Sequence, residues 1–487
     1  MATINITNLT FSYDAGENIF NNVTLRFDTR WKLGLIGRNG RGKTTLLNLL
    51  LGKLPHDGKI DVPVPLDYFP YAVDDKTQWT RQITEQIAAF EPWQLERELS
   101  LLDVSLDVLE RPFASLSGGE QTKILLATLF LNENRFLLID EPTNHLDLEG
   151  REAIGNYLRK KEGFILVSHD RTLLDRCVDH VLSINRSNIE LQQGNFSTWQ
   201  QNRDYQEQFE ESKNRKLQRD IKRLNEACQR SAHWAGQAEK EKYGNGPVDR
   251  GFLGSKAARI MNRAKATDER RQKALEEKSQ LFQNTEVDDR LTLTPLKFHS
   301  SRLLDLVDVS VCYQEDMPLL EHFSLVVGSG DRIALCGKNG CGKSSLLRLI
   351  AGEAVPHFGR CLVPSSLKVS YVPQETSHLQ GSMRDFIEER KLDESFFKTI
   401  LHKLGLPREE FDKEMSGYSA GQKKKVFLAV SFCEQAHLYL WDEPLNYMDV
   451  ISRMQIETML LESFATVIFI EHDKSFLDSV ATKKITL

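Results

Sequence analysis

The chain has 487 residues, too many for a single hydrophobic core and enough for about three domains. Its 40% hydrophobic and 27% charged residues are an ordinary globular balance, which excludes a largely disordered chain. The net charge of −6 is uneven: residues 213–273 hold 17 Lys or Arg and 7 Asp or Glu, so this segment carries +10 and the rest −16. Such asymmetry indicates a polyanionic partner for the basic segment.

Targeting and cysteine patterns exclude several other classes. No run approaches the ~18 apolar residues that a membrane-spanning helix needs, and residues 1–5 lack the basic and apolar regions of a signal peptide. The seven cysteines are odd in number and contain no Cys-x-x-Cys pair, so neither a disulfide framework nor a zinc site is indicated. We therefore expect a cytoplasmic protein.

The first 200 residues alternate strand and helix patterns. Residues 3–6 and 9–13 alternate as strands do, and the apolar run 33–36 predicts a short strand before a glycine-rich loop. Residues 44–51 then predict a helix. Continuous apolar runs at 136–139 and 164–167 are typical of parallel strands that are buried on both faces.

The middle of the chain predicts two helices. Residues 200–240 hold no proline and one glycine, and Leu217, Ile221, Leu224 and Cys228 recur at the spacing of a two-stranded helical seam. The run Tyr243-Gly244-Asn245-Gly246-Pro247 breaks the first helix, and a second helical pattern follows from 255 to about 282. We expect an antiparallel helical hairpin whose tip lies near 241–256.

The strand patterns recur about 300 residues later, at 333–336, 438–441 and 467–470. This internal repeat predicts an α/β fold with two tandem P-loop nucleotide-binding domains at 1–198 and 300–487. The basic helical hairpin at 199–299 joins them.

Each repeat contains a glycine-rich phosphate loop, Gly-Arg-Asn-Gly-Arg-Gly-Lys-Thr at 37–44 and Gly-Lys-Asn-Gly-Cys-Gly-Lys-Ser at 337–344. The glycines let backbone amides converge on phosphate oxygens at a helix N-terminus. The lysine reaches the β and γ phosphates of ATP, and the hydroxyl that follows it ligates Mg²⁺. The candidate nucleotide-binding residues of the two loops are Gly37, Asn39, Gly40, Gly42, Lys43, Thr44, Thr45, Gly337, Asn339, Gly340, Gly342, Lys343, Ser344 and Ser345.

An acidic pair ends one apolar strand of each repeat. Asp140 and Asp442 are placed to ligate Mg²⁺ beside Thr44 and Ser344, respectively. Glu141 and Glu443 follow directly and suit a general base for γ-phosphate hydrolysis. A solvated strand end is the alternative interpretation, which the neighbouring phosphate loops disfavour.

A histidine follows a further apolar strand in each repeat. His169 and His472 each precede an aspartate and are candidate sensors of the γ-phosphate. A lone histidine at such a position is more often packed in a core, but the repeated His-Asp pair favours a functional role.

The segment Leu-Ser-Gly-Gly-Glu-Gln at 116–121 resembles the signature of ATP-binding cassette proteins, and the likeness covers nearly the whole chain. In that family two cassettes pack head to tail, so the resemblance implies that Lys43 faces 419–422 and Lys343 faces 117–121. The implied nucleotide contacts from the two signatures are Ser117, Gly118, Gly119, Glu120, Ser419, Ala420, Gly421 and Gln422. Tyr13 and Tyr313 stand where the family stacks an aromatic ring on adenine; a buried strand tyrosine is the alternative.

Two departures from the family pattern fall on one composite site. Gln374 resembles the family's magnesium-contacting glutamine, but Tyr71 stands at that position in the first repeat. The signature at 418–421 reads Tyr-Ser-Ala-Gly. Both changes belong to the site of Lys43, so we expect the two sites to hydrolyse ATP at different rates.

The segment Glu-Pro-Thr-Asn-His-Leu-Asp at 141–147 resembles the ABC-F class of cassette proteins, and Tyr71 and the basic hairpin agree with it. An ATPase subunit of a transporter and a repair-type cassette ATPase are the alternatives. ABC-F membership implies a monomer that pairs its cassettes internally, has no membrane subunit, and binds the tRNA exit site of the 70S ribosome, the peptidyl-site tRNA and 23S rRNA. The candidate contacts of the hairpin are Lys213, Lys216, Arg219, Lys222, Arg223, Phe252, Leu253, Lys256, Arg259 and Arg263.

Residues 249–265 resemble the hairpin tip of the Lsa/Vga-type antibiotic-resistance members, and only about 45 residues separate Tyr71 from Leu116. This resemblance implies ribosome protection: displacement of lincosamides, pleuromutilins and group A streptogramins from the peptidyl-transferase centre. A housekeeping factor that rescues stalled ribosomes is the alternative.

Overall fold

A computed structural model describes residues 2–13, 18–132, 134–144, 146–185, 188–206, 291–314, 317–338 and 340–487, with single positions between 208 and 273. The contacts within the chain define two compact units. One comprises Met1–Ile184, Asn188–Phe196 and Asp289–Leu487, and so contains both predicted nucleotide-binding domains. The other comprises Asn185–Ser187 and Ser197–Asp288. The boundaries 1–198, 199–299 and 300–487 stay predictions.

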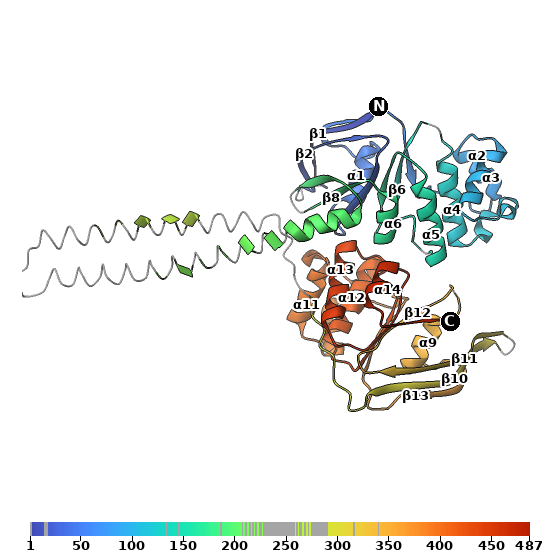
Figure 1. Ribbon diagram of the computed structural model, residues 1–487, viewed down its shortest axis with the longest axis vertical. Helices are drawn as coiled ribbons and strands as arrows, with labels where there is room; N and C mark the ends of the chain where they lie inside the picture. The colour runs from blue at the N-terminus through green and yellow to red at the C-terminus, as the bar shows by residue number, and fades with distance from the viewer. Residues whose placement is uncertain are drawn as a thin grey trace, which may run out of the picture. The chain divides into compact units, whose positions relative to one another are not determined.

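The first repeat is built on a six-stranded sheet of order β5-β6-β7-β3-β8-β9, parallel except for β9. A three-stranded antiparallel sheet of order β2-β1-β4 lies beside it. Helix α1 lies between the two sheets, and α2, α3 and α4 gather at the other side of β6 (Figure 1). The strands are β1 (Thr3–Phe11), β2 (Phe20–Asp28), β3 (Lys32–Gly37), β4 (Asp57–Asp61), β5 (Leu66–Phe69), β6 (Phe136–Asp140), β7 (Phe164–Val167), β8 (His180–Ile184) and β9 (Ile189–Gln193). The helices are α1 (Lys43–Leu50), α2 (Thr80–Ile87), α3 (Pro92–Leu101), α4 (Gly118–Leu129), α5 (Leu148–Arg159) and α6 (Arg171–Cys177), with short 3-10 turns at Leu106–Glu110 and Phe113–Ser115.

The second repeat has the same plan, with a parallel sheet of order β14-β15-β16-β12-β17 and an antiparallel sheet of order β11-β10-β13. Its strands are β10 (Arg302–Gln314), β11 (Met317–Gly328), β12 (Arg332–Cys336), β13 (His357–Leu362), β14 (Val369–Val372), β15 (Leu438–Asp442), β16 (Val467–Ile470) and β17 (Lys483–Thr486). Its helices are α9 (Lys343–Ile350), α10 (Met383–Arg390), α11 (Glu394–Lys403), α12 (Ala420–Cys433), α13 (Val450–Glu462) and α14 (Lys474–Val480), with 3-10 turns at Arg408–Asp412 and Met415–Gly417.

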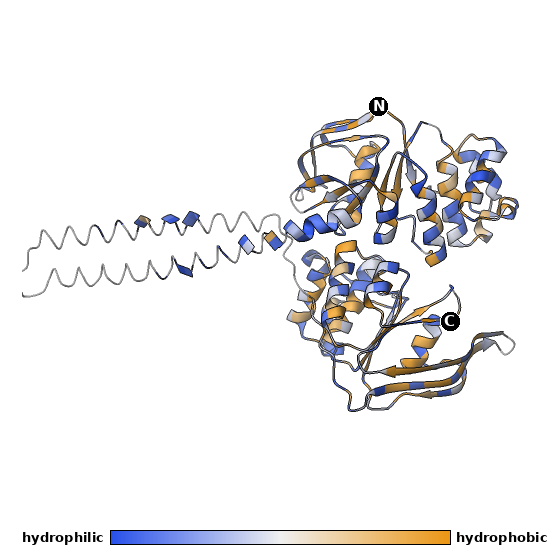
Figure 2. Ribbon diagram, in the orientation of Figure 1, coloured by the Kyte–Doolittle hydropathy of each residue, from blue (hydrophilic) through white to orange (hydrophobic). Residues whose placement is uncertain are grey.

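The continuous apolar runs form the central strands of both parallel sheets, as predicted. All four residues of β7 and of β16 are buried, because helices cover both faces of these sheets. Figure 2 shows the hydrophobic residues concentrated in these strands. Parallel neighbours end at the same edge of a sheet, so the segments after β3, β6 and β7 converge there. The fold class predicted from the repeat is confirmed.

Of the middle segment, residues 196–206 are helical, and so are the described positions further along. The described helical positions beyond 206 are all exposed: 208, 209, 212, 213, 216, 219, 222, 223, 226, 259, 262, 265, 266, 269, 270, 272 and 273. The predicted seam residues Leu217, Ile221, Leu224 and Cys228 and the predicted tip at 241–256 lie outside the described residues. No helix in the described part of the chain has the length and apolarity needed to cross a membrane.

A buried carboxylate joins two helices of the first repeat. Glu98 on α3 is 1% exposed and accepts hydrogen bonds from the Tyr157 hydroxyl (2.7 Å) and the Lys161 ammonium (2.5 Å). Arg97 donates a third hydrogen bond to it, at 3.0 Å. Because a buried charge is tolerated only with such partners, Glu98 fixes α3 against the end of α5.

We predict that Glu98→Ala lowers the free energy of unfolding by about 3 kcal/mol, because it leaves a buried hydroxyl and an ammonium without their acceptor. Urea denaturation followed by tryptophan fluorescence measures the change. The control is Glu96→Ala, an exposed glutamate of the same helix, which should shift stability by less than about 0.5 kcal/mol. Equal denaturation midpoints for the two variants would contradict the role of Glu98.

Candidate functional site

The phosphate loop of the first repeat runs from the end of β3 to the start of α1. Gly42 has a φ of 93°, and a Cβ atom on it would lie 2.6 Å from Ile19 Cγ2, so only glycine fits. Lys43 Nζ donates to the carbonyl oxygen of Gly37 (2.7 Å) and to Asn39 Oδ1 (3.2 Å). Burial lowers the pKa of Lys43. An ammonium held by neutral acceptors beside a helix N-terminus suits the binding of an anion such as phosphate.

The second phosphate loop borders a cavity. Lys343 Nζ donates to the carbonyl oxygens of Gly337 and Lys338, both at 2.8 Å. The predicted contact Asn339 lies outside the described residues. The cavity has a volume of about 310 Å³ and is lined by Leu146, Arg151, Leu319, Gly340, Gly342, Lys343, Ser344, Ser345, Gln374, Glu443, Asn446 and His472. Its lining combines the second loop with Leu146 and Arg151 of the first repeat. The signature residues 117–121 are not among these lining residues, so the expected facing of Lys343 and 117–121 stays a prediction.

The predicted magnesium ligands lie together at the strand ends. Thr44 Oγ1 donates to Asp140 Oδ2 at 3.1 Å, and burial raises the pKa of Asp140. Burial raises the pKa of Asp442 to about 6, against a smaller opposing effect of the Ser344 hydroxyl. Both carboxylate oxygens of Asp442 are buried, and neither accepts a well-formed hydrogen bond from a described residue. An oxygen-seeking divalent cation would supply the missing partner, so these residues fit Mg²⁺.

The two repeats hold this aspartate differently, which the sequence did not indicate. In the first repeat the Tyr68 hydroxyl on β5 also donates to Asp140 Oδ2, at 3.2 Å. Tyr371 occupies the corresponding place on β14, but its buried hydroxyl forms no well-formed hydrogen bond with a described residue; Asp442 and Arg348 of α9 are its charged neighbours. Asn48 stands at the position of Arg348 in the first repeat. Ser344 Oγ donates to Gln374 Oε1 at 3.4 Å, whereas Tyr71 is 40% exposed.

The two candidate bases share a strained backbone. Glu141 and Glu443 have φ values of 51° and 50°, in the left-handed region that non-glycine residues seldom adopt. His169 Nε2 lies 3.2 Å from Glu141 Oε1, and His472 Nε2 lies 3.7 Å from Glu443 Oε1. Strain of this kind concentrates at functional sites. Nothing in the sequence predicts this backbone conformation.

The pKa values of the two glutamates are shifted in opposite directions. Burial raises the pKa of Glu141 to about 7, and the charge of Arg453 only partly opposes this. Burial also acts on Glu443, but the neighbouring His472, with Gln374 and Lys424, outweighs it and holds the pKa at about 2. Burial keeps the pKa of His169 well below its usual value.

The signature segments begin helices α4 and α12. Ser117 accepts a hydrogen bond from the Glu120 amide (3.3 Å), and the Glu120 carboxylate accepts one from the Ser117 amide (2.8 Å). Ser419 and Gln422 form the same capping box at 3.2 and 2.8 Å. Glu120 and Gln422 therefore organise the helix starts. The glycines and Ala420 between them are exposed or half-buried.

Tyr13 and Tyr313 are 51% and 54% exposed, so they are not buried strand tyrosines. Each hydroxyl lies 3.1 Å from the second hydroxyl residue of its phosphate loop, Thr45 Oγ1 or Ser345 Oγ. The rings are thus accessible beside the loops. Adenine stacking on them stays a prediction.

The first phosphate loop contacts the second repeat directly. The Asn39 amide donates to Asp449 Oδ2 (3.1 Å), and Asn39 Nδ2 donates to the Tyr447 carbonyl (2.8 Å). A Cβ atom on Gly421 would lie 2.9 Å from Tyr447 Cβ, so this loop and the second signature share a neighbour. These contacts place residues 447–449 beside the first phosphate loop, and the facing of Lys43 and 419–422 stays a prediction.

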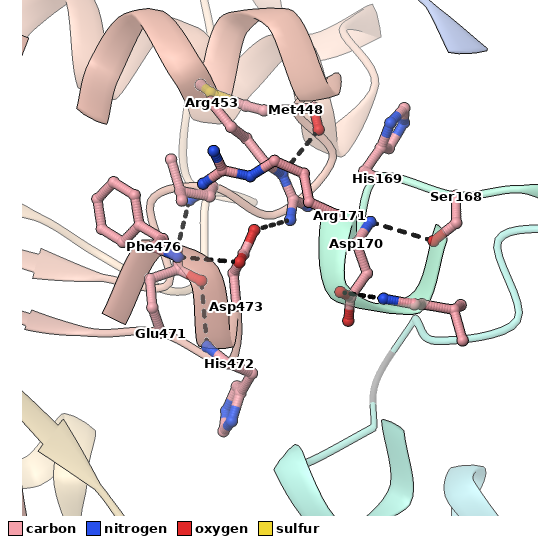
Figure 3. A network of polar contacts seen from close by, with 12 residues as sticks. Ser168, His169, Asp170, Arg171, Met448, Arg453, Glu471, His472, Asp473 and Phe476 are labelled. Carbon is pink, nitrogen blue, oxygen red and sulfur yellow. Dashed lines mark hydrogen bonds and ion pairs between the residues drawn. The ribbon is translucent and has the colours of Figure 1, made fainter. Parts of the chain in front are cut away.

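Sequence reasoning also missed the polar network behind the histidines (Figure 3). Arg453 donates to the Met448 carbonyl (3.0 Å) and to Asp473 Oδ2 (3.1 Å). Glu471 Oε1 accepts from the Leu445 amide at 2.7 Å, and Glu471 Oε2 from the His472 amide at 3.2 Å. The loops that carry Glu443 and His472 are therefore tied to each other.

The predicted hairpin contacts divide into two groups. Lys213, Lys216, Arg219, Lys222, Arg223 and Arg259 are helical and exposed. Phe252, Leu253, Lys256 and Arg263 lie outside the described residues.

We predict different pH dependence for Glu141→Gln and Glu443→Gln in nucleotide-free protein with a chelator: between pH 5 and 8 the effect of Glu141→Gln changes with pH, and the effect of Glu443→Gln stays constant. The folded pKa of Glu141 lies above its unfolded value near ~4.3, so wild type loses stability relative to Glu141→Gln as the pH rises from 5 to 8. The folded pKa of Glu443 lies below its unfolded value, so Glu443→Gln is destabilising at both pH values. Unfolding temperatures measure both effects, and a parallel pH response of the two variants would show the assignment to be wrong.

Comparison with known proteins places the chain in a family. A family model described as ABC transporter matches residues 20–144 and 320–446, more than half of the chain. The putative ATP-binding protein YdiF of Bacillus subtilis is 26% identical over 100% of this chain and 80% of its own length. The ribosome protection protein VmlR of Bacillus subtilis is 26% identical over 99% and 86%. The probable ATP-binding protein YheS of Escherichia coli K12 is 27% identical over 95% and 75%.

Solved structures agree on the fold. The archaeal ribosome recycling factor aABCE1, solved with the ribosomal stalk protein aP1, has a TM-score of 0.63 at 19% identity, over 98% of this chain and 87% of that one. The RNase-L Inhibitor has a TM-score of 0.62 at 18% identity, with the same coverage. Both segments matched by the family model contain a phosphate loop and a strand-end Asp-Glu pair, so the chain belongs to the ATP-binding cassette (ABC transporter) family, as a tandem-cassette protein of the ABC-F type.

Proposed function

We propose that this protein hydrolyses Mg²⁺-ATP at two composite sites and uses cassette closure to bind the ribosome. The observation that carries the proposal is the cavity at Lys343, because its lining comes from both cassettes. A nucleotide in this cavity would contact both cassettes at once. Its binding and hydrolysis would then be linked to their closure and opening.

Each residue type of the motifs has a distinct role in the proposed reaction. Bound Mg²⁺-ATP supplies the scissile phosphoanhydride and a cation that neutralises charge on its phosphates. Lys43 and Lys343 hold the phosphates through Nζ. A carboxylate oxygen of Glu141 or Glu443 accepts a proton from the attacking water, and the histidine Nε2 atoms beside them orient the γ-phosphate. Asp140 and Asp442 hold the cation with the adjacent hydroxyls.

The two sites are proposed to differ in rate. Burial raises the pKa of Glu141 to about 7, whereas the pKa of Glu443 is held at about 2, so the two candidate bases differ in basicity. Gln374 reaches the hydroxyl beside Lys343, while Tyr71 replaces it at the other site. These differences lead us to expect different hydrolysis rates at the two sites.

The proposed partner is the cytoplasmic 70S ribosome. Exposed cations at Lys213, Lys216, Arg219, Lys222 and Arg223 follow one helical segment and suit RNA phosphates. One relative is named a ribosome protection protein. We propose that the hairpin enters the tRNA exit site, contacts the peptidyl-site tRNA and 23S rRNA, and displaces lincosamides, pleuromutilins and group A streptogramins.

We predict that Glu141→Gln with Glu443→Gln slows ATP hydrolysis by about 10²–10⁴-fold, because both proton acceptors are lost. The variant should then stay on ribosomes in ATP, as measured by sucrose-gradient sedimentation. Lys43→Ala with Lys343→Ala is the control, which should not be retained because nucleotide binding is lost. A Glu-to-Gln double variant that sediments free of ribosomes in ATP would contradict ribosome binding; co-purification with a membrane subunit would support a transporter.

We predict that expression in a drug-sensitive, efflux-competent host raises the inhibitory concentrations of the three drug classes at least fourfold. Lys213→Gln, Lys216→Gln and Arg219→Gln together should reduce this protection, because fewer RNA phosphates are neutralised. The matched control replaces the exposed cassette residues Lys59, Lys391 and Arg408 by Gln. Unchanged susceptibility with retained ribosome binding would instead support the housekeeping rescue function.

A further inference from the structure

A buried lysine lies in the signature helix of the second cassette. Lys424, on α12, is 2% exposed, and its Nζ donates to the carbonyl oxygens of Pro373 (2.7 Å) and Asp442 (2.5 Å). Burying an ammonium is unfavourable unless its donors are used. Through these two hydrogen bonds Lys424 connects helix α12 to the loop at Pro373 and to the end of β15.

Both acceptors belong to segments that carry predicted magnesium ligands. Pro373 directly precedes Gln374, and Asp442 is itself the ligand at the end of β15. Gln374 borders the cavity at Lys343 and a second cavity of about 390 Å³ that is also lined by Lys424 and Glu443. Open space on two sides leaves the glutamine loop with little packing, so the lysine is an important anchor for it.

The first cassette has no lysine at the position that corresponds to Lys424. Thr122 lies five residues after Ser117, as Lys424 lies five after Ser419, and a threonine is too short to reach the same two carbonyls. That cassette also has Tyr71 in place of the glutamine. The lysine is therefore present in the cassette that keeps the glutamine.

A second exchange between the cassettes accompanies the lysine. Glu471, which is 4% exposed, occupies the position of Ser168, and its negative charge favours the charged form of Lys424. Burial lowers the pKa of Lys424 to about 8, against the charges of Asp442, Glu471 and Glu443. The second cassette thus has a buried cation and a buried anion where the first has Thr122 and Ser168.

We propose that Lys424 is a positioning residue that holds the Gln374 loop against the end of β15, in the geometry that Mg²⁺-nucleotide needs at Lys343. Helix α12 begins at the second signature, and Tyr447, beside Gly421, accepts a hydrogen bond from Asn39 of the first phosphate loop. The start of this helix therefore lies beside the loop that contacts the first phosphate loop. This inference rests on the proposed binding of Mg²⁺-ATP.

The test uses the full chain with Lys43→Ala, so that only the Lys343 site binds nucleotide. Binding of a fluorescent ATP analogue is titrated with Mg²⁺ at constant nucleotide. Lys424→Met, which keeps the apolar stem and removes the donors, should raise the Mg²⁺ midpoint by about tenfold, as loss of a group that orients a metal ligand does. Lys425→Met is the matched control: Lys425 is 4% exposed and donates to Gly405, away from the glutamine loop.

The same titration in a Gln374→Ala background separates positioning from general destabilisation. If Lys424 acts through the glutamine, Lys424→Met should shift the midpoint less than twofold in that background. An equal shift with and without Gln374, or no shift at all, would overturn the role of Lys424 while Mg²⁺-nucleotide binding stands. If the Lys43→Ala chain binds no Mg²⁺-nucleotide, the proposed function itself fails and the inference falls with it.

Discussion

Buried charge that the protein only partly compensates dominates the structure at the ends of its parallel strands. The Asp442 carboxylate and the Lys43 ammonium are removed from water without ion-pair partners at contact distance among the described residues. Such groups are unfavourable in isolation, and a ligand with the opposite charges relieves them. The same burial explains why the pKa of Lys43 is lowered and the pKa values of Asp140 and Asp442 are raised.

Duplication has produced two versions of the arrangement in one chain. In the first cassette the Tyr68 and Thr44 hydroxyls donate hydrogen bonds to the aspartate, and burial raises the pKa of the glutamate to about 7. In the second, the aspartate lacks well-formed hydrogen bonds, and the glutamate stays ionised beside a histidine. The differences lie around the motifs more than within them. Comparing the two cassettes therefore shows how the surrounding residues change the properties of the same motif.

Contacts between the cassettes make the two sites interdependent. The loop that follows Glu443 in the chain carries Tyr447 and Asp449, both of which hydrogen-bond to Asn39 in the opposite phosphate loop. Arg171 and Glu457 form a further ion pair between cassettes at 2.5 Å, largely shielded from solvent. A movement of the loop after Glu443 would therefore be transmitted through these hydrogen bonds to the phosphate loop of the first cassette.

The sequence alone determined the duplicated α/β fold, the phosphate loops and the acidic strand ends. These features are local, because apolar runs, glycine spacing and adjacent carboxylates can be recognised within about ten residues of sequence. Only the tertiary structure decided that Tyr68 contacts Asp140, that Lys424 joins the loop before Gln374 to β15, and that Glu141 and Glu443 differ in pKa. Those properties depend on burial and on partners far away in the chain, because the electrostatic energy of a charge is set by everything packed around it.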